Sequence, residues 1–328
     1  MLHQKRKLLH KLPCVGIDIL GSDRSPQELL DALLPELHRL QNIAEFMLFC
    51  EPVHAAILPS FLSYMPATTL AMQESPMKGL RKPDTSVTLG IKALKQGTID
   101  ALLSMGNTGA LTLQAHRLLP PISSSWKRPA LLAIVPSKQS TFAMLDIGAN
   151  LEGNAHDLVG FAAMGVAYQQ ACGIAHPKLH LLNLGSEPYK GPKVLVDTYQ
   201  QLHNHPTLHA FFCGNIEGHT LFTTPTDVVV TLGFSGNICL KTAEGMAELF
   251  CHDTSSSLTQ HLLKHSVKGA LFVGLQGLLF KCHGRLKPHL FAQNIEPIIH
   301  LIEHRFLANF QQNLLYFEKN AQPPRLIP

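Results

Sequence analysis

The sequence predicts an α/β fold, in which a largely parallel sheet is covered by helices on both faces as a three-layer α/β/α arrangement. Short β-rich runs alternate with amphipathic runs along almost the whole chain, as expected when helices join consecutive parallel strands. The β-rich runs are apolar almost throughout, which is typical of strands buried on both faces. Hydrophobic residues make up 45% of the 328 residues and charged residues 15%, which supports a large core and excludes disorder as the overall state.

The first strand is predicted at residues 14–19, and a helix start follows it. Ser25 can cap that helix, Pro26 suits its first position, and Glu28 completes a capping box. Two further helices are predicted at residues 84–96 and 156–171, because Gly97 and Gly173 follow them as stop signals. The remaining strands are predicted at residues 46–50, 69–72, 101–105, 130–135, 141–147, 179–184, 208–213, 227–232 and 270–273.

The chain has no internal repeat, no low-complexity linker and no strong domain boundary. We therefore predict a basic tail at residues 1–11 and one catalytic domain, with Rossmann-like layering, at residues 12–328. We do not expect the basic tail to be a secretory signal, because Asp18 interrupts the apolar stretch that follows it.

The composition favours a reduced, cytoplasmic protein. The seven cysteines form no CxxC pair, and most lie in or beside apolar runs, as small hydrophobic residues do. The sequence has no run of the roughly 18 apolar residues that a membrane span requires. The formal net charge of +4 is small and diffuse, so no nucleic-acid partner is expected.

Glycine and asparagine recur where the predicted strands end. Ligands of open α/β sheets bind in the loops after the carboxyl ends of the strands. Glycine lets backbone amides approach a ligand closely, and helices that begin just after such loops, predicted here at Thr108 and Gly236, attract anions. Any single loop of this kind is also ordinary turn chemistry, but the pattern repeats at residues 21–23, 106–109, 146–150, 183–185, 214–218 and 233–237. The sequence therefore predicts an anion site.

Two lysines stand out in this charge-poor chain. Lys190 follows an apolar strand, and Lys241 lies about one turn into the helix predicted at Gly236. A lysine in such a place can bind phosphate as a compact charge, or it can be a solvated surface residue. Arg81 and Lys82, just before the helix at residues 84–96, could extend the positive rim.

Several familiar chemistries are excluded by their missing motifs. The chain has no GxxxxGK[ST] phosphate loop, no GxGxxG after the first strand and no HExxH, and the segment 233–237 misses the GxSxG pattern at Asn237. No group of aspartates suggests a metal, and the histidines are scattered. We expect neither a cofactor nor a metal.

Together, these loops resemble the bacterial acyl carrier protein-dependent phosphate acyltransferases of the PlsX type. The family motif SAGNTGAL is similar to residues 104–111, LLDVGAN to 144–150, GNVEG to 214–218, and DVVVCDGFVGNVVLKTSEG to 227–245. The opening VDAMGGD motif is matched loosely by residues 17–23, and the family's LLNIG…KG is similar to residues 181–185 with Lys190 and Gly191. The matches run in the same order from about Val15 to Gly245.

Beyond Gly245 the resemblance thins. The family carries a longer pair of amphipathic helices there, which holds its members to the inner membrane surface. The corresponding interval is shorter in this chain, and residues 246–267 are predicted to form a reduced helical hairpin region. Membrane contact is therefore expected to be peripheral at most.

The resemblance implies a reaction in which an acyl carrier protein thioester and inorganic phosphate give acyl phosphate and free carrier. It also implies a homodimer, and a downstream glycerol-3-phosphate acyltransferase that uses the acyl phosphate for phospholipid synthesis. A short-chain phosphate acyltransferase that uses coenzyme A thioesters remains an alternative, as does a non-catalytic paralogue that binds acylated carrier. A dehydrogenase of the isocitrate type shares the broad architecture but would need an aspartate cluster for its metal.

The loops and the family matches give the predicted site. We predict that Lys190 and the loops of Asn107 and Asn237 bind phosphate, that Asn215 and Glu217 line the same site, and that Asp146 with Asn150 orders the loops. The predicted catalytic residues are Lys190, Asn215 and Asn237. The predicted substrate-binding residues are Asp18, Gly21, Asp23, Lys82, Gly106, Asn107, Thr108, Asp146, Asn150, Glu217, Gly236 and Lys241.

Overall fold

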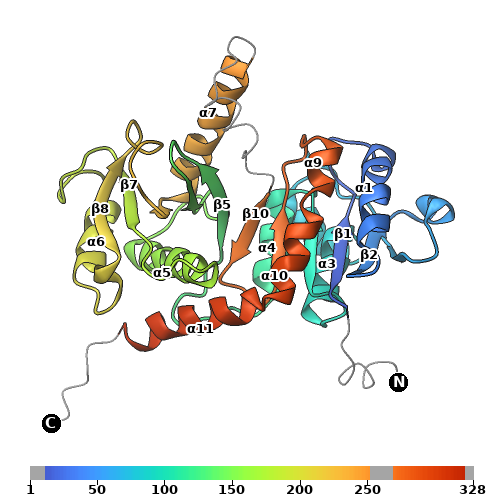
Figure 1. The fold of residues 1–328 in the computed structure, drawn as a ribbon, viewed down its shortest axis with the longest axis horizontal. Coiled ribbons are helices and arrows are strands. Elements are labelled where there is room, and N and C mark those ends of the chain that lie inside the picture. The colour runs from blue at the N-terminus through green and yellow to red at the C-terminus, as the bar shows by residue number, and fades with distance from the viewer. Residues whose placement is uncertain (1–11, 252–268, 322–328) are drawn as a thin grey trace. The chain divides into compact units, whose positions relative to one another are not determined.

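The computed structural model describes residues 12–251 and 269–321, which divide into two compact units (Figure 1). Unit 1 contains residues 12–119 and 277–305, and unit 2 contains residues 120–251, 269–276 and 306–321. The chain passes between the units at three points, none of them marked by a linker, which explains why the sequence predicts one domain. The predicted tail at residues 1–11 and most of the predicted hairpin region at residues 246–267 lie outside the described residues.

Unit 1 is built on a parallel sheet. Its strand order is β3 (Ser63–Pro66), β2 (Glu45–Cys50), β1 (Cys14–Asp18), β4 (Ala101–Ser104) and β11 (Leu278–Lys281), and each neighbouring pair is parallel. Every residue of β1 and β4 is buried, so both faces of these strands are covered. The helices are α1 (Pro26–Leu40), α2 (Pro76–Arg81), α3 (Ser86–Lys95), α4 (Thr108–Leu118), α9 (Pro288–Ala292) and α10 (Ile295–Glu303), with a 3₁₀ turn η1 (Pro52–Ile57).

Unit 2 is built on a mixed sheet. Its order is β10 (Ala270–Val273), β5 (Ala130–Pro136), β6 (Thr141–Leu145), β9 (Val228–Val230), β7 (Leu179–Asn183) and β8 (Phe212–Glu217). The first two pairings are antiparallel, and the four strands from β6 to β8 are parallel. The helices are α5 (Ala155–Ala171), α6 (Lys193–His203), α7 (Gly233–Cys251) and α11 (Phe306–Lys319). Figure 1 shows α5 against the sheet, where it packs on β6 and β9, with α11 beside it.

The predicted α/β class is confirmed, as are the local signals that set several element ends. Ser25 and Glu28 form the capping box of α1. Gly97 and Gly173 take the positive φ angles of 67° and 97° at the ends of α3 and α5, the conformation that commonly ends a helix. The structure starts α3 at Ser86, two residues after the predicted start, because Thr85 is its cap.

Some predicted strands are wrong. Residues 69–72 form a loop, and the edge strand β3 lies instead at Ser63–Pro66, where two exposed residues and a proline weaken the strand pattern. The predicted strand at 208–213 is divided into the 3₁₀ turn η2 (Leu208–Ala210) and β8. Strand β11 was not predicted, because the apolar run from residue 269 to 280 hides the turn at Gly274, where φ is 91°.

Helices long and apolar enough to cross a membrane do not occur among residues 12–251 and 269–321.

Candidate active site

The predicted site residues fall into two sets, one in each unit. Unit 1 holds Asp18, Gly21, Asp23, Lys82, Gly106, Asn107 and Thr108. Unit 2 holds Asp146, Asn150, Lys190, Asn215, Glu217, Gly236, Asn237 and Lys241. In each set, one aspartate at the end of a strand organises the loops around it.

Asp18 is the organising aspartate of unit 1. It ends β1 and is fully buried. Its Oδ1 accepts a hydrogen bond from the backbone N–H of Leu20 at 3.0 Å, and its Oδ2 accepts one from the Ser104 hydroxyl at 2.7 Å. Ser104 Oγ in turn accepts the backbone N–H of Gly106 at 3.0 Å. Asp18 was predicted to bind substrate; the structure buries it and shows it holding the loops of Gly21 and Gly106.

A buried lysine lies beside this aspartate and was not predicted from the sequence. Lys281 ends β11, with 6% of its surface exposed, opposite Ser104 of β4. Its Nζ donates to the carbonyl oxygens of Met105, at 3.4 Å, and Cys282. Burial raises the pKa of the Asp18 carboxyl above its ordinary value, and hydrogen bonds and the charge of Lys281 offset this only in part. The only sequence signal was a lysine two residues before His283-Gly284.

The raised pKa of Asp18 gives a testable pH dependence. Its folded-state pKa lies above the ordinary value of 3.8, so the folded protein holds this proton more tightly than the unfolded chain does. The resulting stability is present below pH 3.8 and is lost as the pH rises through the folded-state pKa. We expect the melting temperature of the native protein, minus that of Asp18→Asn, to fall as the pH is raised over this range. A difference that stays constant with pH would contradict this assignment.

Asn107 connects two loops of unit 1. Its Oδ1 caps α4 by accepting the N–H of Ala110 at 3.0 Å. Its Nδ2 donates to the carbonyls of Ala71, Met72 and Glu74 at 3.4, 3.0 and 3.0 Å. The side chain is therefore occupied within the protein, and what α4 offers a ligand is the first-turn backbone N–H groups of Thr108 and Gly109, as at any helix start.

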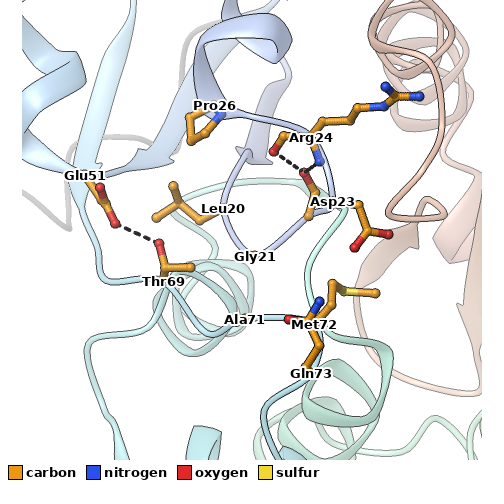
Figure 2. A pocket seen from close by; sticks show the side chains of 11 residues that line it. Leu20, Gly21, Asp23, Arg24, Pro26, Glu51, Thr69, Ala71, Met72 and Gln73 are labelled. Atoms are coloured by element: carbon orange, nitrogen blue, oxygen red, sulfur yellow. Dashed lines mark hydrogen bonds between the residues drawn. The ribbon is translucent and has the colours of Figure 1, made fainter.

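Two other predicted residues of unit 1 surround a pocket. Gly21 has a φ of 71°, and a Cβ there would overlap the Leu70 carbonyl oxygen, so only glycine fits this turn. Gly21 and Asp23 help to line a cavity of about 430 Å³ (Figure 2). Asp23 Oδ2 lies 3.6 Å from Arg285 Nε.

Lys82, the remaining predicted residue of unit 1, follows the end of α2. Its Nζ lies 3.9 Å from Glu74 Oε1, and the side chain is half exposed.

In unit 2, the predicted residues follow four adjacent parallel strands, β6, β9, β7 and β8. Leu145 of β6 is in register with Val230 of β9, which is in register with Leu181 of β7. Asn183 of β7 is in register with Glu217 of β8. Because parallel strands end at one edge of a sheet, these loops emerge side by side, about 4.8 Å apart per strand. The structure thus brings together the loops that carry this set of predicted residues.

Asp146 is the organising aspartate of this edge and is fully buried. Its Oδ1 accepts the N–H groups of Leu131, Gly148 and Ala149 at 2.9, 3.1 and 3.0 Å. Its Oδ2 accepts the backbone N–H of Asn150 at 2.7 Å and the Asn150 side chain at 3.0 Å. Asn150 Nδ2 also donates to the Pro129 carbonyl at 2.8 Å. These contacts fix the 146–150 loop, in the role predicted for Asp146 and Asn150.

The start of α7 packs directly on that loop. A Cβ at Gly233 would lie 2.7 Å from Asp146 Oδ2, and one at Gly236 would overlap the Asp146 carbonyl oxygen. Asn237 Nδ2 donates to the Ile147 carbonyl at 3.2 Å. The predicted helix start at Gly236 is wrong, because α7 begins at Gly233 and the Gly236 N–H already donates to Leu232. The two glycines allow this close approach, which moves the open first-turn amides to residues 233–235.

Lys190 lies on the loop after β7, and Asn183 holds that loop closed. Asn183 Nδ2 donates to the Lys190 carbonyl at 2.9 Å. Gly191, with a φ of 91°, passes so close to Asn183 that a Cβ would overlap it. The Lys190 Nζ is 3.8 Å from Glu187 Oε1, and the side chain is 40% exposed. The Lys190–Glu187 pairing is too long for a hydrogen bond, so it occupies none of the donors of the ammonium. Asn183 was not predicted as a site residue.

Asn215 and Glu217 follow on β8. Asn215 Nδ2 donates to the Glu187 carbonyl at 2.9 Å, which ties β8 to the Lys190 loop. Its Oδ1 is buried and has no hydrogen-bond partner among the described residues. Glu217 Oε2 lies 3.7 Å from His219 Nδ1.

Lys241, the other predicted lysine of this unit, lies two turns along α7. Its Nζ pairs with Glu244 Oε2 at 2.5 Å, so Lys241 is more firmly paired than Lys190.

Among the described residues, this edge of unit 2 therefore offers the open backbone amides at the start of α7 and the Lys190 ammonium. Its buried carboxylate, Asp146, already accepts hydrogen bonds from the protein. Such a set favours a small anion, since backbone amides and one lysine bind it without surrounding it with charge.

Comparison with known proteins identifies the family. Residues 14–309 match the profile of the family described as fatty acid synthesis protein. The chain belongs to this family. Its relatives within the fatty acid synthesis protein family include a phosphate acyltransferase of Chlamydia caviae, which is 38% identical over 83% of this chain and 89% of the relative. Another, a phosphate acyltransferase of Pseudothermotoga lettingae, is 36% identical over 82% of this chain and 87% of the relative. The predicted family resemblance is confirmed, as is the prediction that the chain is a phosphate acyltransferase.

The fold has a counterpart among solved structures. A branched-chain phosphotransacylase from Enterococcus faecalis aligns with a TM-score of 0.59 over 92% of this chain and 99% of that one, at 14% identity. At this identity the likeness concerns the fold, and it agrees with the mostly parallel sheet flanked by helices.

Proposed function

We propose that the protein transfers a fatty acyl group from acyl carrier protein to inorganic phosphate, giving acyl phosphate for phospholipid synthesis. The observation that carries the proposal is the strand-end edge of unit 2, where Lys190 and the start of α7 provide donors for a small anion. Family membership supports the acyl-transfer chemistry.

The chemistry requires little from the protein beyond placement. A phosphate oxygen attacks the thioester carbonyl carbon, the C–O bond forms, the C–S bond breaks, and the carrier leaves as a thiolate that takes up a proton. Phosphate is a nucleophile near neutral pH, so a covalent enzyme intermediate is unnecessary. Holding it beside the carbonyl is worth about 7–11 kcal/mol, and each donor to the developing oxyanion about 3–4 kcal/mol. Sparse positive charge suits this reaction, because a heavily neutralised phosphate would attack more slowly.

In this proposal, Lys190 and the first-turn amides of α7 bind phosphate, while Asp146, Asn150 and Asn237 hold the loops that present them. Asn215 stays a catalytic candidate because its buried Oδ1 is an acceptor without a partner among the described residues, suited to a protonated phosphate oxygen. The homodimer, the peripheral membrane contact and the downstream glycerol-3-phosphate acyltransferase belong to the same proposal.

The test uses the full chain with labelled phosphate and three acyl donors: palmitoyl-acyl carrier protein, acetyl-coenzyme A and butyryl-coenzyme A. We expect labelled palmitoyl phosphate, detected by mass, with the carrier thioester as the preferred donor. Turnover of the coenzyme A thioesters alone would replace the proposal with a short-chain phosphate acyltransferase. Binding of acylated carrier without acyl phosphate would indicate the non-catalytic alternative.

A further inference from the structure

The pocket in unit 1 has a mixed lining. It lies after the ends of β1 and β2, and its lining includes Leu20, Pro26, Glu51, Thr69, Met72 and Gln73. Apolar and hydrogen-bonding side chains therefore share one cavity of about 430 Å³, within the range of about 300–1,000 Å³ that is usual for small-molecule sites. The Gln73 side chain makes no hydrogen bond to the described residues, and Glu51 accepts one from the Thr69 hydroxyl at 2.8 Å.

The charges around the pocket disfavour an anion. Glu51 and Asp23 both line it. The one cationic side chain in the lining, Arg24, donates through Nη2 to the Arg285 carbonyl at 3.1 Å, and its Nε is a buried donor with no hydrogen-bond partner among the described residues. Figure 2 shows that guanidinium pointing away from Glu51 and Thr69. The polar groups also disfavour a purely hydrocarbon ligand, because a chain without donors or acceptors would leave them unpaired.

A neutral chain that carries amide groups fits this pocket, because it brings no negative charge and still offers hydrogen-bonding groups to the polar lining. Its amide N–H groups would meet Glu51 and the loop carbonyls, and its methylene and methyl groups would meet Leu20, Pro26 and Met72. The pocket also adjoins the loop that Asp18 holds, since the Gly21 Cβ position is 3.7 Å from the Cα of Gly106. A chain bound there would end beside the first turn of α4.

We propose that this pocket binds the pantetheine arm of the acyl donor. The inference rests on the proposed function, because thioester donors of both kinds, carrier protein and coenzyme A, present their acyl group on a pantetheine chain with two amides. The pocket would therefore recognise the same arm whether the donor is a carrier protein or coenzyme A.

The first test measures binding of pantetheine alone to the full chain by titration calorimetry. We compare the native protein with two pocket-filling variants, Ala71→Trp and Gln73→Trp, and with Val53→Trp as a matched control. Val53 lies on η1, next to β2, and is 73% exposed. We expect the native protein and Val53→Trp to bind pantetheine with equal affinity. Both filled variants should bind it at least about tenfold more weakly. No binding by the native protein, or equal binding by all four proteins, would overturn the inference.

The second test compares two donors that differ only in the arm. S-palmitoyl-pantetheine carries the full arm, whereas S-palmitoyl-N-acetylcysteamine has only its thiol end. In the filled variants, we expect the KM for the pantetheine thioester to be about tenfold higher than in the native protein. The KM for the cysteamine thioester should be unchanged. An equal effect on both thioesters would overturn the inference. Palmitoyl-acyl carrier protein and palmitoyl-coenzyme A should be affected alike, and the native protein's preference between them identifies the source of the arm.

The two proposals fail in different ways. If no thioester yields acyl phosphate but pantetheine binds and the filled variants lose it, the proposed reaction fails and the pantetheine site stands.

Discussion

Lys190→Ala is expected to lower kcat/KM for phosphate by roughly 10²- to 10³-fold, the loss usual for a donor to reacting charge. The ammonium lies on a loop held by Asn183 through the Lys190 backbone carbonyl, which the substitution leaves in place. Its contact with Glu187 is long and exposed, so little stability is lost with it. The melting temperature should therefore change little, and steady-state kinetics with varied phosphate measure the effect.

Lys193→Ala is the matched control for Lys190. Lys193 lies three residues further on, is 87% exposed and pairs with Asp197 within α6 at 2.8 Å. The substitution removes the same charge from the same region, but from a side chain that is paired within α6 with Asp197. We expect its kinetics to match those of the native protein. Equal losses in both variants would reduce the role of Lys190 to a general electrostatic one, and no loss in Lys190→Ala would remove it from the mechanism.

Gly236→Ala is expected to destabilise unit 2 and to lower turnover about 10²-fold. The added methyl group would overlap the Asp146 carbonyl oxygen and lie 2.8 Å from Thr231 Cγ2. Since the nearest atom belongs to backbone fixed by the Asp146 hydrogen bonds, the start of α7 must move away. Overpacking of this kind costs about 3 kcal/mol of unfolding free energy, and a displacement near 1 Å reduces activity about 10²-fold. Denaturant unfolding and the acyl phosphate assay measure the two effects.

Gly245→Ala provides the control on the same helix. No described atom lies within 4 Å of its Cβ position, so the methyl group meets open space. Alanine favours a helix over glycine by about 1 kcal/mol, and we expect equal or greater stability with unchanged turnover. If the two variants behaved alike, the close contact between α7 and the Asp146 loop would not be what makes Gly236 necessary.

The positions of the strand-end asparagines were predictable from the sequence, but their hydrogen-bond partners were not. Their recurrence beside glycine correctly located the loops, and we predicted that several of them contact the ligand. In the structure their amide groups donate to backbone carbonyls of other loops: Asn107 to residues 71–74, Asn150 to Pro129, Asn183 to Lys190, Asn215 to Glu187 and Asn237 to Ile147. These hydrogen bonds show that the asparagine amide groups connect the loops, whereas the contacts predicted between asparagines and a ligand stay predictions.

The sequence alone determined the fold class, the positions of most strands along the chain and the positions of the loops rich in glycine and asparagine that follow them. These features depend on local patterns, namely apolar runs, capping residues and stop glycines, that act within a few residues of one another. Only the tertiary structure decided which strand-end side chains are buried and to which groups of the protein they donate hydrogen bonds. Asp18 and Lys281 are 263 residues apart in the chain, and their meeting in one buried cluster depends on β1 and β11 flanking β4 in a single sheet. No local pattern encodes that neighbourhood, because long-range strand pairing creates it.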